Sequence, residues 1–427
     1  MKRIRSVVRV SAALLIAIVL SLVLTPSARG ASKFKTLYGF RGEKDGRLPS
    51  AGLVFDTAGN LYSTTFDGGI NNLGAVFKLK RNSNGSWTES VIHSFAGNGD
   101  NDGVGPEAGL VFDLAGNLYG TTAFGGQFNG GTVFELTPRA DGSWKESVLH
   151  SFNCLRQNDG CESTAGLTID GAGNLYGTTQ GGGASGMGVV YELSPNLDGS
   201  WKMKILHGFT GGSDGGDPQA ALILDATGKL YGTTSGGGLT KCGAGCGVIF
   251  ELDPNANGTW KEKVLYRFSG ADGENPLANV ILDAAGNVYG ATLSGGNTGC
   301  GSLGCGLVFE LTPNVDGTWR EKVLHRFTGA DGDSPLGSVI LDAAGNLYGT
   351  TMFGGNLSMC SGYGCGVVFT LTPNSNGVWK ETVLHSFSDV PGAIPYAGAI
   401  IDAAGNLFGT THGDGVTSFG SVFEITP

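Results

Sequence analysis

The sequence predicts an all-β chain folded as a seven-bladed β-propeller of four-stranded antiparallel blades, with an N-terminal strand that closes the last blade. Two observations carry this prediction. One motif, Asp-x-x-Gly-Asn-Leu-Tyr-Gly-Thr-Thr, recurs at intervals of 55 to 60 residues, and its aromatic position is Tyr62, Tyr119, Tyr176, Tyr231, Tyr289, Tyr348 and Phe408. The last copy also lacks a segment that is found in front of the first copy.

Each copy is expected to form four short strands, as the second copy illustrates. An apolar run that ends in aspartate is the first strand, at 109–113, and an Ala-Gly turn leads to the second strand at 117–122. The third strand is expected at 131–138 and the fourth at 144–152, with an Asp-Gly turn between them. Such turns between apolar runs are the strongest local signal for hairpins, and the 76 glycines of the chain suit many of them.

The two ends of the repeat array are expected to complete one blade. Residues 32–40 align with the fourth strand at 379–387, whereas the last copy stops at Pro427 without a fourth strand. Pairing the two segments closes the ring and removes the sheet edges that an open array would expose. Small residues at the start of the innermost strands, such as Ala108-Gly109, fit a crowded axis, and aromatic and branched residues of the second and third strands should pack between blades.

The first 30 residues are interpreted as a signal peptide, and residues 31–427 as a single propeller domain. A basic start precedes an apolar run at 11–24 and a small-x-small pattern at 28–30. The run is short for a bilayer span of about 20 residues, although an uncleaved anchor is the alternative. Cleavage would remove five positive charges and change the formal net charge from −10 to −15, which argues against nucleic acid or anionic lipid as partners.

Loops after the second and fourth strands are expected on one face of the ring. They are long and variable, as residues 66–72 and 235–242 illustrate, whereas the loops of the opposite face are short and nearly identical among copies. Variable loops on a rigid scaffold usually carry recognition. This face is therefore the predicted ligand-binding face.

The eight cysteines also belong to this face and are expected to pair locally as four disulfides. An even count in an exported chain favours disulfides, and zinc fits less well because the gaps of three or more residues do not form Cys-x-x-Cys pairs. Free thiols are the other alternative. Each bond closes a short loop and should contribute about 2 kcal/mol. The expected pairs are Cys154–Cys161, Cys242–Cys246, Cys300–Cys305 and Cys360–Cys365.

Ionisable residues on the variable face are the candidates for ligand contact. An Asp-Gly pair recurs in the loop after the fourth strand, where its carboxylates could bind calcium or sugar hydroxyls or could simply cap their own turns. Histidines recur once per copy on the outermost strand, too dispersed to converge, and are expected to be framework residues. His412 differs, because it lies in a loop beside Asp414 and is either an acid–base group or a solvent-exposed residue. The candidate ligand residues are Asp67, Asp102, Asp214, Asp272, Asp331, His412 and Asp414.

No catalytic, cofactor-binding or metal-binding residue is predicted. The Gly-Gly runs lack the following Lys-Ser/Thr and helix of a phosphate-binding loop, and no Gly-x-Ser-x-Gly elbow is present. The aspartate that closes the first strand occurs in all seven copies, and the threonine pair of the second strand occurs in six of them. Features present in every blade are expected to build the blade.

The units at 341–351 and 366–373 resemble the GloVer (Gloeobacter–Verrucomicrobia) tandem repeat, and the resemblance covers essentially the whole mature chain. It implies a bacterial surface or secreted protein of the choice-of-anchor kind. Such proteins often end in an anchoring signal, whereas this chain ends at Pro427 without one. The family has no assigned catalytic residues, so the resemblance implies none in this chain. The Asp-x-x-Gly-Asn-Leu-Tyr core is also similar, more distantly, to NHL-type propellers.

Two functions follow as hypotheses. The favoured one is a monomeric, non-catalytic binding or scaffold propeller, secreted, periplasmic or at the cell surface, that recognises a glycan or a protein through its variable face. The alternative is an extracellular polysaccharide hydrolase or lyase with acid and base among Asp67, His412 and Asp414. A central pocket lined by non-repeated polar groups would favour the alternative, and an axis lined only by glycine and alanine would count against it.

Overall fold

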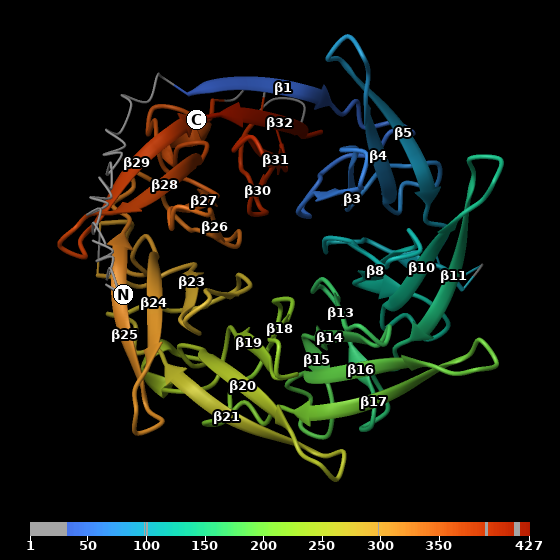
Figure 1. Cartoon of the computed structure of the whole chain (residues 1–427), viewed down its shortest axis with the longest axis horizontal. Helices are drawn as coiled ribbons and strands as arrows, with labels where there is room; N and C mark the ends of the chain where they lie inside the picture. Colours follow the sequence, from blue (N-terminus) through green and yellow to red (C-terminus); the bar gives the residue numbers. More distant parts are fainter. Residues whose placement is uncertain (1–31, 98, 100, 298, 389–391, 414–418) are drawn as a thin grey trace, which may run out of the picture.

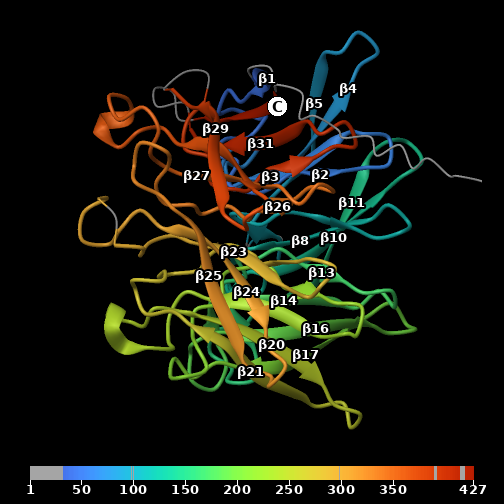
Figure 2. The ribbon, with the colours of Figure 1, turned by 60° about the vertical axis from the view of Figure 1, so that its left-hand side comes forward.

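The structure is a computed structural model that describes residues 32–97, 99, 101–297, 299–388, 392–413 and 419–427. The predicted signal peptide lies outside these residues. Seven four-stranded antiparallel sheets surround a central axis, as Figures 1 and 2 show from two directions. The predicted seven-bladed propeller is confirmed.

The innermost strands of blades one to seven are β2 (Val54–Phe55), β7 (Val111–Phe112), β13 (Thr168–Ile169), β18 (Ile223–Leu224), β22 (Ile281–Leu282), β26 (Ile340–Leu341) and β30 (Ile400–Ile401). The second strands are β3 (Leu61–Thr65), β8 (Leu118–Thr122), β14 (Leu175–Thr179), β19 (Leu230–Thr234), β23 (Val288–Thr292), β27 (Leu347–Thr351) and β31 (Leu407–Thr411). The third strands are β4 (Ala75–Arg81), β10 (Thr132–Pro138), β16 (Val189–Pro195), β20 (Val248–Pro254), β24 (Leu307–Pro313), β28 (Val367–Pro373) and β32 (Ser421–Thr426). The outermost are β5 (Trp87–Ser94), β11 (Trp144–Ser151), β17 (Trp201–Gly208), β21 (Trp260–Arg267), β25 (Trp319–Arg326), β29 (Trp379–Ser386) and β1 (Lys33–Gly39).

The innermost strands are shorter than predicted. In blade two the ladder covers only β7, although the apolar run begins at Gly109. The carbonyl of Ala108 instead accepts a hydrogen bond from the Thr64 hydroxyl of blade one, 3.2 Å away. At the other end of the strand, Asp113 accepts the backbone amides of Ala115 and Asn117, as expected of a turn-closing aspartate.

The N-terminal strand closes the ring. β1 pairs antiparallel with β32, from Lys33 opposite Thr426 to Gly39 opposite Ser421, and Figure 1 shows the two strands side by side. Phe34 of β1 also stacks on His385 of blade six, with 4.0 Å between ring centroids. The closure predicted from the ends of the repeat array is thus confirmed.

A buried threonine hydroxyl joins each blade to the next at six of the seven junctions. The first threonine of each pair on the second strand donates to a carbonyl of the segment that leads into the innermost strand of the following blade, and Ala291 takes its place in blade five. Thr410 donates to Ala51 at 3.0 Å and so links the last blade to the first. The other five bonds are Thr64–Ala108, Thr121–Ala165, Thr178–Ala220, Thr233–Ala278 and Thr350–Ala397.

The second threonine of each pair explains the recurrent Asp-Gly motif. The Thr122 side chain packs so closely on Gly103 that a Cβ at that glycine would lie 2.3 Å from the threonine methyl carbon. The Thr122 hydroxyl also donates to the carbonyl of Phe124 and shapes the following loop. Only glycine fits against this threonine, and the same contact recurs between Gly160 and Thr179.

Apolar side chains fill the space between blades. One core cluster combines Tyr62 and Val76 of blade one with Leu118 and Phe134 of blade two. A tryptophan opens six of the seven outermost strands and extends this contact, since the ring of Trp144 meets Tyr62 edge-on at 6.1 Å. The expected packing between neighbouring blades is therefore present.

The outer rim carries a second, polar contact between blades. The rim histidine or tyrosine of one blade lies beside the aspartate of its own following loop, as in His93 and Asp102, whose Nε2 and Oδ2 atoms are 3.1 Å apart. A glutamate on the outermost strand of the next blade, here Glu146, interacts with the charges of both. One carboxyl oxygen of each such glutamate is buried without a hydrogen-bond partner among the described residues: Glu89, Glu146, Glu262, Glu321 and Glu381.

Burial, helped by the neighbouring aspartate, raises the pKa of each of these five glutamates to about 7. Two junctions lack a glutamate. Met203 stands at the equivalent position of blade three and Phe34 at that of blade seven. The rim therefore tolerates an apolar side chain at this position.

We expect Thr410→Val to lower the free energy of unfolding by about 1 kcal/mol, because the carbonyl of Ala51 loses its donor from the last blade and keeps only the Ser63 hydroxyl of its own blade, 3.3 Å away. Denaturant unfolding of the purified protein measures the change. Thr372→Val, at an exposed threonine, is the matched control and should unfold like the parent. Equal stability of the two variants would show that the closing bond contributes nothing.

The rim glutamates should make the protein less stable as the pH rises. Their pKa is higher in the folded state than the ordinary 4.5, so folding binds protons between pH 4.5 and about 7, and this contribution to stability is lost across that interval. Replacing all five glutamates by glutamine should flatten the pH dependence of the unfolding free energy. Histidines with lowered pKa, such as His207 and His385, act in the opposite direction and remain in both proteins.

The control for this experiment is Glu43→Gln, which changes an exposed carboxyl group. Its unfolding free energy should follow that of the parent protein at every pH. If the five-fold variant also follows the parent, the rim glutamates do not couple folding to protonation.

Candidate functional site

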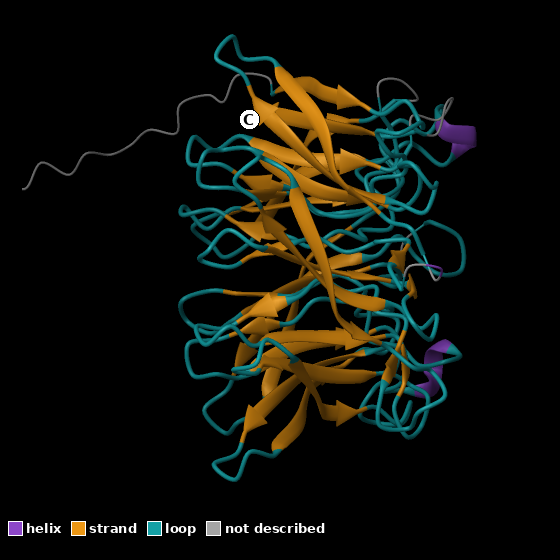
Figure 3. Ribbon diagram, turned by 90° about the vertical axis from the view of Figure 1, so that its right-hand side faces the viewer, coloured by secondary structure: helices purple, strands orange, loops and turns teal. Residues whose placement is uncertain are grey.

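The two sets of variable loops lie together on one face. The loop after the fourth strand pairs with the loop after the next second strand, for example β6 (Gly103–Val104) with β9 (Phe124–Gly125) and β12 (Gly160–Cys161) with β15 (Gly181–Gly182). Figure 3 shows the short helices η2 (Thr240–Cys242) and η3 (Cys360–Gly362) on the same side of the ring. The predicted division into a variable and a uniform face is observed.

Four disulfides stiffen the variable face, and their pairing is the one predicted: Cys154–Cys161, Cys242–Cys246, Cys300–Cys305 and Cys360–Cys365. Cys246, Cys305 and Cys365 are fully buried. Their carbonyls accept the amides of Asn275, Ser334 and Ile394 in the next blade. These bonds therefore hold the loop of one blade against its neighbour, and four disulfides are consistent with an oxidising compartment.

The recurrent aspartates do not converge on one site. Asp102, Asp214, Asp272 and Asp331 each accept a backbone amide of their own loop. Each also lies beside the rim histidine or tyrosine of its blade, with separations of 2.6 to 3.7 Å. This is the turn-capping arrangement that the sequence left open as an alternative, completed by a rim partner that sequence reasoning did not identify.

The other acidic candidates are placed separately. Asp67 forms an ion pair with Arg47, with 3.0 Å between Oδ2 and the guanidinium nitrogen. Asp414 lies outside the described residues. Cys300, Cys305 and Asp333 form a cluster of potential metal ligands, but the two sulfur atoms are bonded to each other and are not free thiolates.

His412 lies where the ring closes. Its Nδ1 atom is 3.0 Å from the Ser50 hydroxyl of blade one, and its ring lies 4.4 Å from that of Tyr396. Burial lowers the pKa of His412, so the neutral imidazole is favoured. His412 is therefore half-buried and lines the axial pocket described below.

A pocket of about 690 Å³ opens around the axis between the seven innermost strands. In each blade, a small residue such as Ala108 begins the segment that leads into the innermost strand. The residue directly before that small residue lies at the mouth of the pocket. This position differs in almost every blade, although the framework around it repeats. From blade one to blade seven the mouth residues are Ser50, Glu107, Thr164, Gln219, Leu277, Leu336 and Tyr396.

The backbone holds this mouth rigidly. Two residues before each mouth residue the chain adopts a positive φ, between 53° and 63°. The backbone amide of that residue donates a hydrogen bond to the preceding blade; that of Glu162, for example, donates to the carbonyl of Gly130. Its carbonyl accepts an amide from the loop after the second strand, as the carbonyl of Glu162 accepts the amide of Gln180. Six of the seven mouth residues also follow a proline. The side chains therefore project from seven fixed points.

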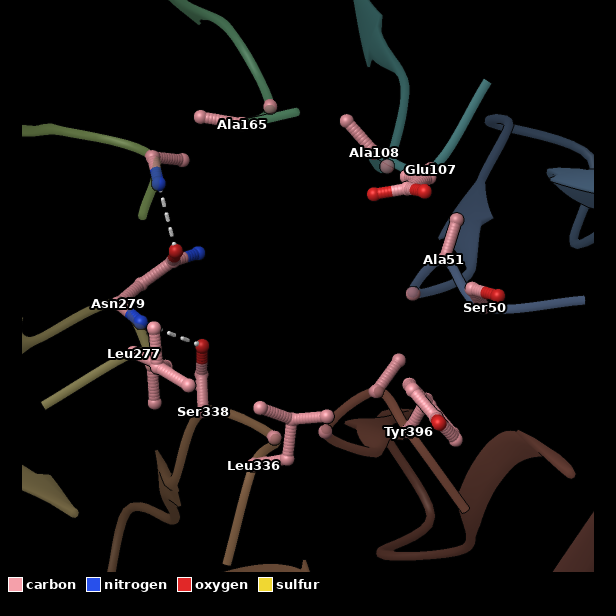
Figure 4. A pocket seen from close by; sticks show the side chains of 18 of the residues that line it. Ser50, Ala51, Glu107, Ala108, Ala165, Leu277, Asn279, Leu336, Ser338 and Tyr396 are labelled. Atoms are coloured by element: carbon pink, nitrogen blue, oxygen red, sulfur yellow. Dashed lines mark hydrogen bonds between the residues drawn. The ribbon is translucent and has the colours of Figure 1, made fainter. Parts of the chain in front are cut away.

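The pocket has an apolar side and a polar side. Figure 4 shows Leu277, Leu336 and Tyr396 along one side of the opening and Glu107 on the other. Deeper in the pocket, the side-chain oxygen of Asn279 accepts the backbone amide of Ala221 at 2.7 Å, and the backbone amide of Asn279 donates to the Ser338 hydroxyl at 3.1 Å. The axis is thus lined by more than glycine and alanine.

Glu107 is the one carboxylate among the lining residues, and none of them is a lysine or an arginine. Its side chain is half-buried and has no hydrogen bond or ion pair within the described part of the chain. Burial, and then the charge of Glu162, raise the pKa of Glu107. Sequence reasoning missed this residue, although an alignment of the seven copies shows the variable position directly before the small residue.

One solved structure that resembles the chain is a proposed oxidoreductase (glucose dehydrogenase) from Thermus thermophilus. It is 13% identical with a TM-score of 0.41, over 93% of this chain and all of that one. Among curated proteins there is no sequence match. Within the described residues no helix is long and apolar enough to cross a membrane.

The model of the Gloeobacter/Verrucomicrobia repeat matches residues 23–244 and 243–427, which together include all seven blades. The repeated Asp-x-x-Gly-Asn-Leu-Tyr-Gly-Thr-Thr motif, whose structural role is described above, lies within both matches. The chain belongs to the Gloeobacter/Verrucomicrobia repeat family.

Proposed function

We propose that this protein is an exported, non-catalytic propeller that binds a glycan at the mouth of its axial pocket. One observation carries the proposal. The repeat is nearly uniform along its strands and turns, yet it varies at the position that faces the pocket, from Ser50 to Tyr396. Variation among converging side chains on a rigid frame is typical of a recognition site.

The chemistry of the mouth suits a sugar. Glu107, Gln219 and Thr164 offer a carboxylate, an amide and a hydroxyl group, which can exchange hydrogen bonds with sugar hydroxyls. On the other side, the Tyr396 ring offers an apolar surface for the C–H groups of a sugar ring. A pocket of about 690 Å³ lies within the usual range for small-ligand sites of roughly 300–1,000 Å³.

Export is part of the proposal. Residues 1–30 have the basic start, apolar run and small-x-small pattern of a signal peptide. The four disulfides would form and persist after transfer to an oxidising compartment. The ligand would then be a glycan outside the cytoplasm.

A second candidate function is hydrolysis or elimination on a polysaccharide. It is favoured by two ionisable groups in one pocket, since Glu107 has a raised pKa and His412 a lowered one. A raised carboxyl pKa favours the protonated form that a general acid needs, and a lowered imidazole pKa favours the neutral form that a general base needs. Asp67 is less suited to this role because it is paired with Arg47.

Binding should depend on the mouth and not on the uniform face. We expect Tyr396→Ala and Gln219→Ala to weaken glycan binding by about tenfold each, the equivalent of about 1.4 kcal/mol. Titration calorimetry on residues 31–427, with a ligand selected on a glycan array, measures this change. Ser83→Ala, in an exposed turn between the third and fourth strands, is the control and should bind like the parent.

Three results would contradict the proposal. Binding that is unchanged in both mouth variants would place the ligand elsewhere. Binding of a protein but of no glycan would show a different ligand class. Polysaccharide cleavage that disappears in Glu107→Gln would favour the hydrolase or lyase.

A further inference from the structure

Glu107 is an acidic residue without a counter-ion in the partly enclosed axial pocket. Its carboxylate reaches into the axial pocket, as Figure 4 shows. No lysine or arginine lines that pocket, and no ion pair to Glu107 is formed by any residue that the structure describes. A carboxylate withdrawn from water without a partner is unfavourable. A cationic ligand would supply the missing partner.

A second carboxylate strengthens the negative potential on this side of the mouth. Glu162, on the loop of blade three, is close enough for its charge to raise the pKa of Glu107. The backbone of Glu162 has a positive φ of 60°, and its N–H donates a hydrogen bond to the carbonyl of Gly130, which holds this residue in place. Glu162 does not itself line the pocket, but its charge adds to that of Glu107 and disfavours an anionic ligand such as a uronic acid beside Glu107.

The mouth also offers an aromatic ring near this charge. Tyr396 of blade seven is separated from Glu107 of blade two by Ser50 of blade one, and Leu336 lies on its other side (Figure 4). An aromatic face attracts both a cation and the C–H groups of a sugar ring. A ligand that joins an ammonium group to a sugar ring would match both sides of the mouth at once, whereas a simple amine would leave the apolar side without a contact.

We propose that the glycan bound at the axial mouth is built of amino sugars with free amino groups, and that Glu107 receives one ammonium group of the chain. This inference rests on the proposed function, because it names the class of glycan for the same site. The ammonium donates a charge-assisted hydrogen bond to the Glu107 carboxylate while the sugar ring lies toward Tyr396. Acetylation of the amino group would remove that charge.

Three tetrasaccharides of the same β-1,4 linkage test this inference: one of glucosamine, one of N-acetylglucosamine and one of glucose. Titration calorimetry with residues 31–427 at about pH 7, where part of the amino groups of the glucosamine tetramer carries a proton, measures their affinities. We expect the glucosamine tetramer to bind about tenfold more tightly than the other two.

The variant Glu107→Gln should abolish this preference without abolishing binding of the acetylated tetramer, because only the charge is lost. Glu162→Gln should reduce the preference by a smaller factor. Glu43→Gln removes an exposed carboxyl group of the same loop face that does not line the pocket, and it should keep the full preference. Unchanged thermal unfolding of each variant shows that a lost preference is not lost folding.

The results separate this inference from the proposal on which it rests. Equal affinity for the glucosamine and glucose tetramers would overturn the amino-sugar inference and leave glycan binding in place. A preference for glucosamine that persists in Glu107→Gln would overturn the role of that residue. No binding of any of the three, together with an array that detects no glycan, would overturn both.

Discussion

The structure depends on a buried hydrogen bond between a threonine hydroxyl and a carbonyl of the segment that leads into the innermost strand of the next blade. Thr410 makes this bond to Ala51 and links the last blade to the first in the ring that β1 and β32 close. Each acceptor is the residue directly after a mouth residue, as Ala108 is after Glu107. The bond that holds two blades together therefore also fixes the backbone from which the pocket is lined.

One junction shows how the frame tolerates the loss of this bond. In blade five the threonine is replaced by Ala291, so no hydroxyl reaches the inner segment of blade six. There the amide of Asn279 donates to the Ser338 hydroxyl and bridges the same two blades. This hydrogen bond lies deeper in the pocket than the mouth residues, and Asn279 and Ser338 make the pocket wall polar at this point.

The framework also accounts for many residues that look functional. Rim histidines and loop aspartates pair with each other within a blade, as His150 and Asp159 do at 2.9 Å. The glycine of each Asp-Gly motif is required because a threonine methyl group packs on it, as for Gly160. Once these structural roles are assigned, few polar residues remain without one. Glu107 is the clearest of them.

The sequence by itself determined the repeat, the ring closure by residues 32–40, the pairing of the cysteines and the face that carries the variable loops. These features depend on periodicity and on neighbours along the chain, which a sequence displays directly. Only the tertiary structure decided that His412 is half-buried against Tyr396 and Ser50. It also decided that seven residues spaced by whole blades meet around one pocket. Such contacts join positions far apart in the chain, and they exist only when the ring has closed.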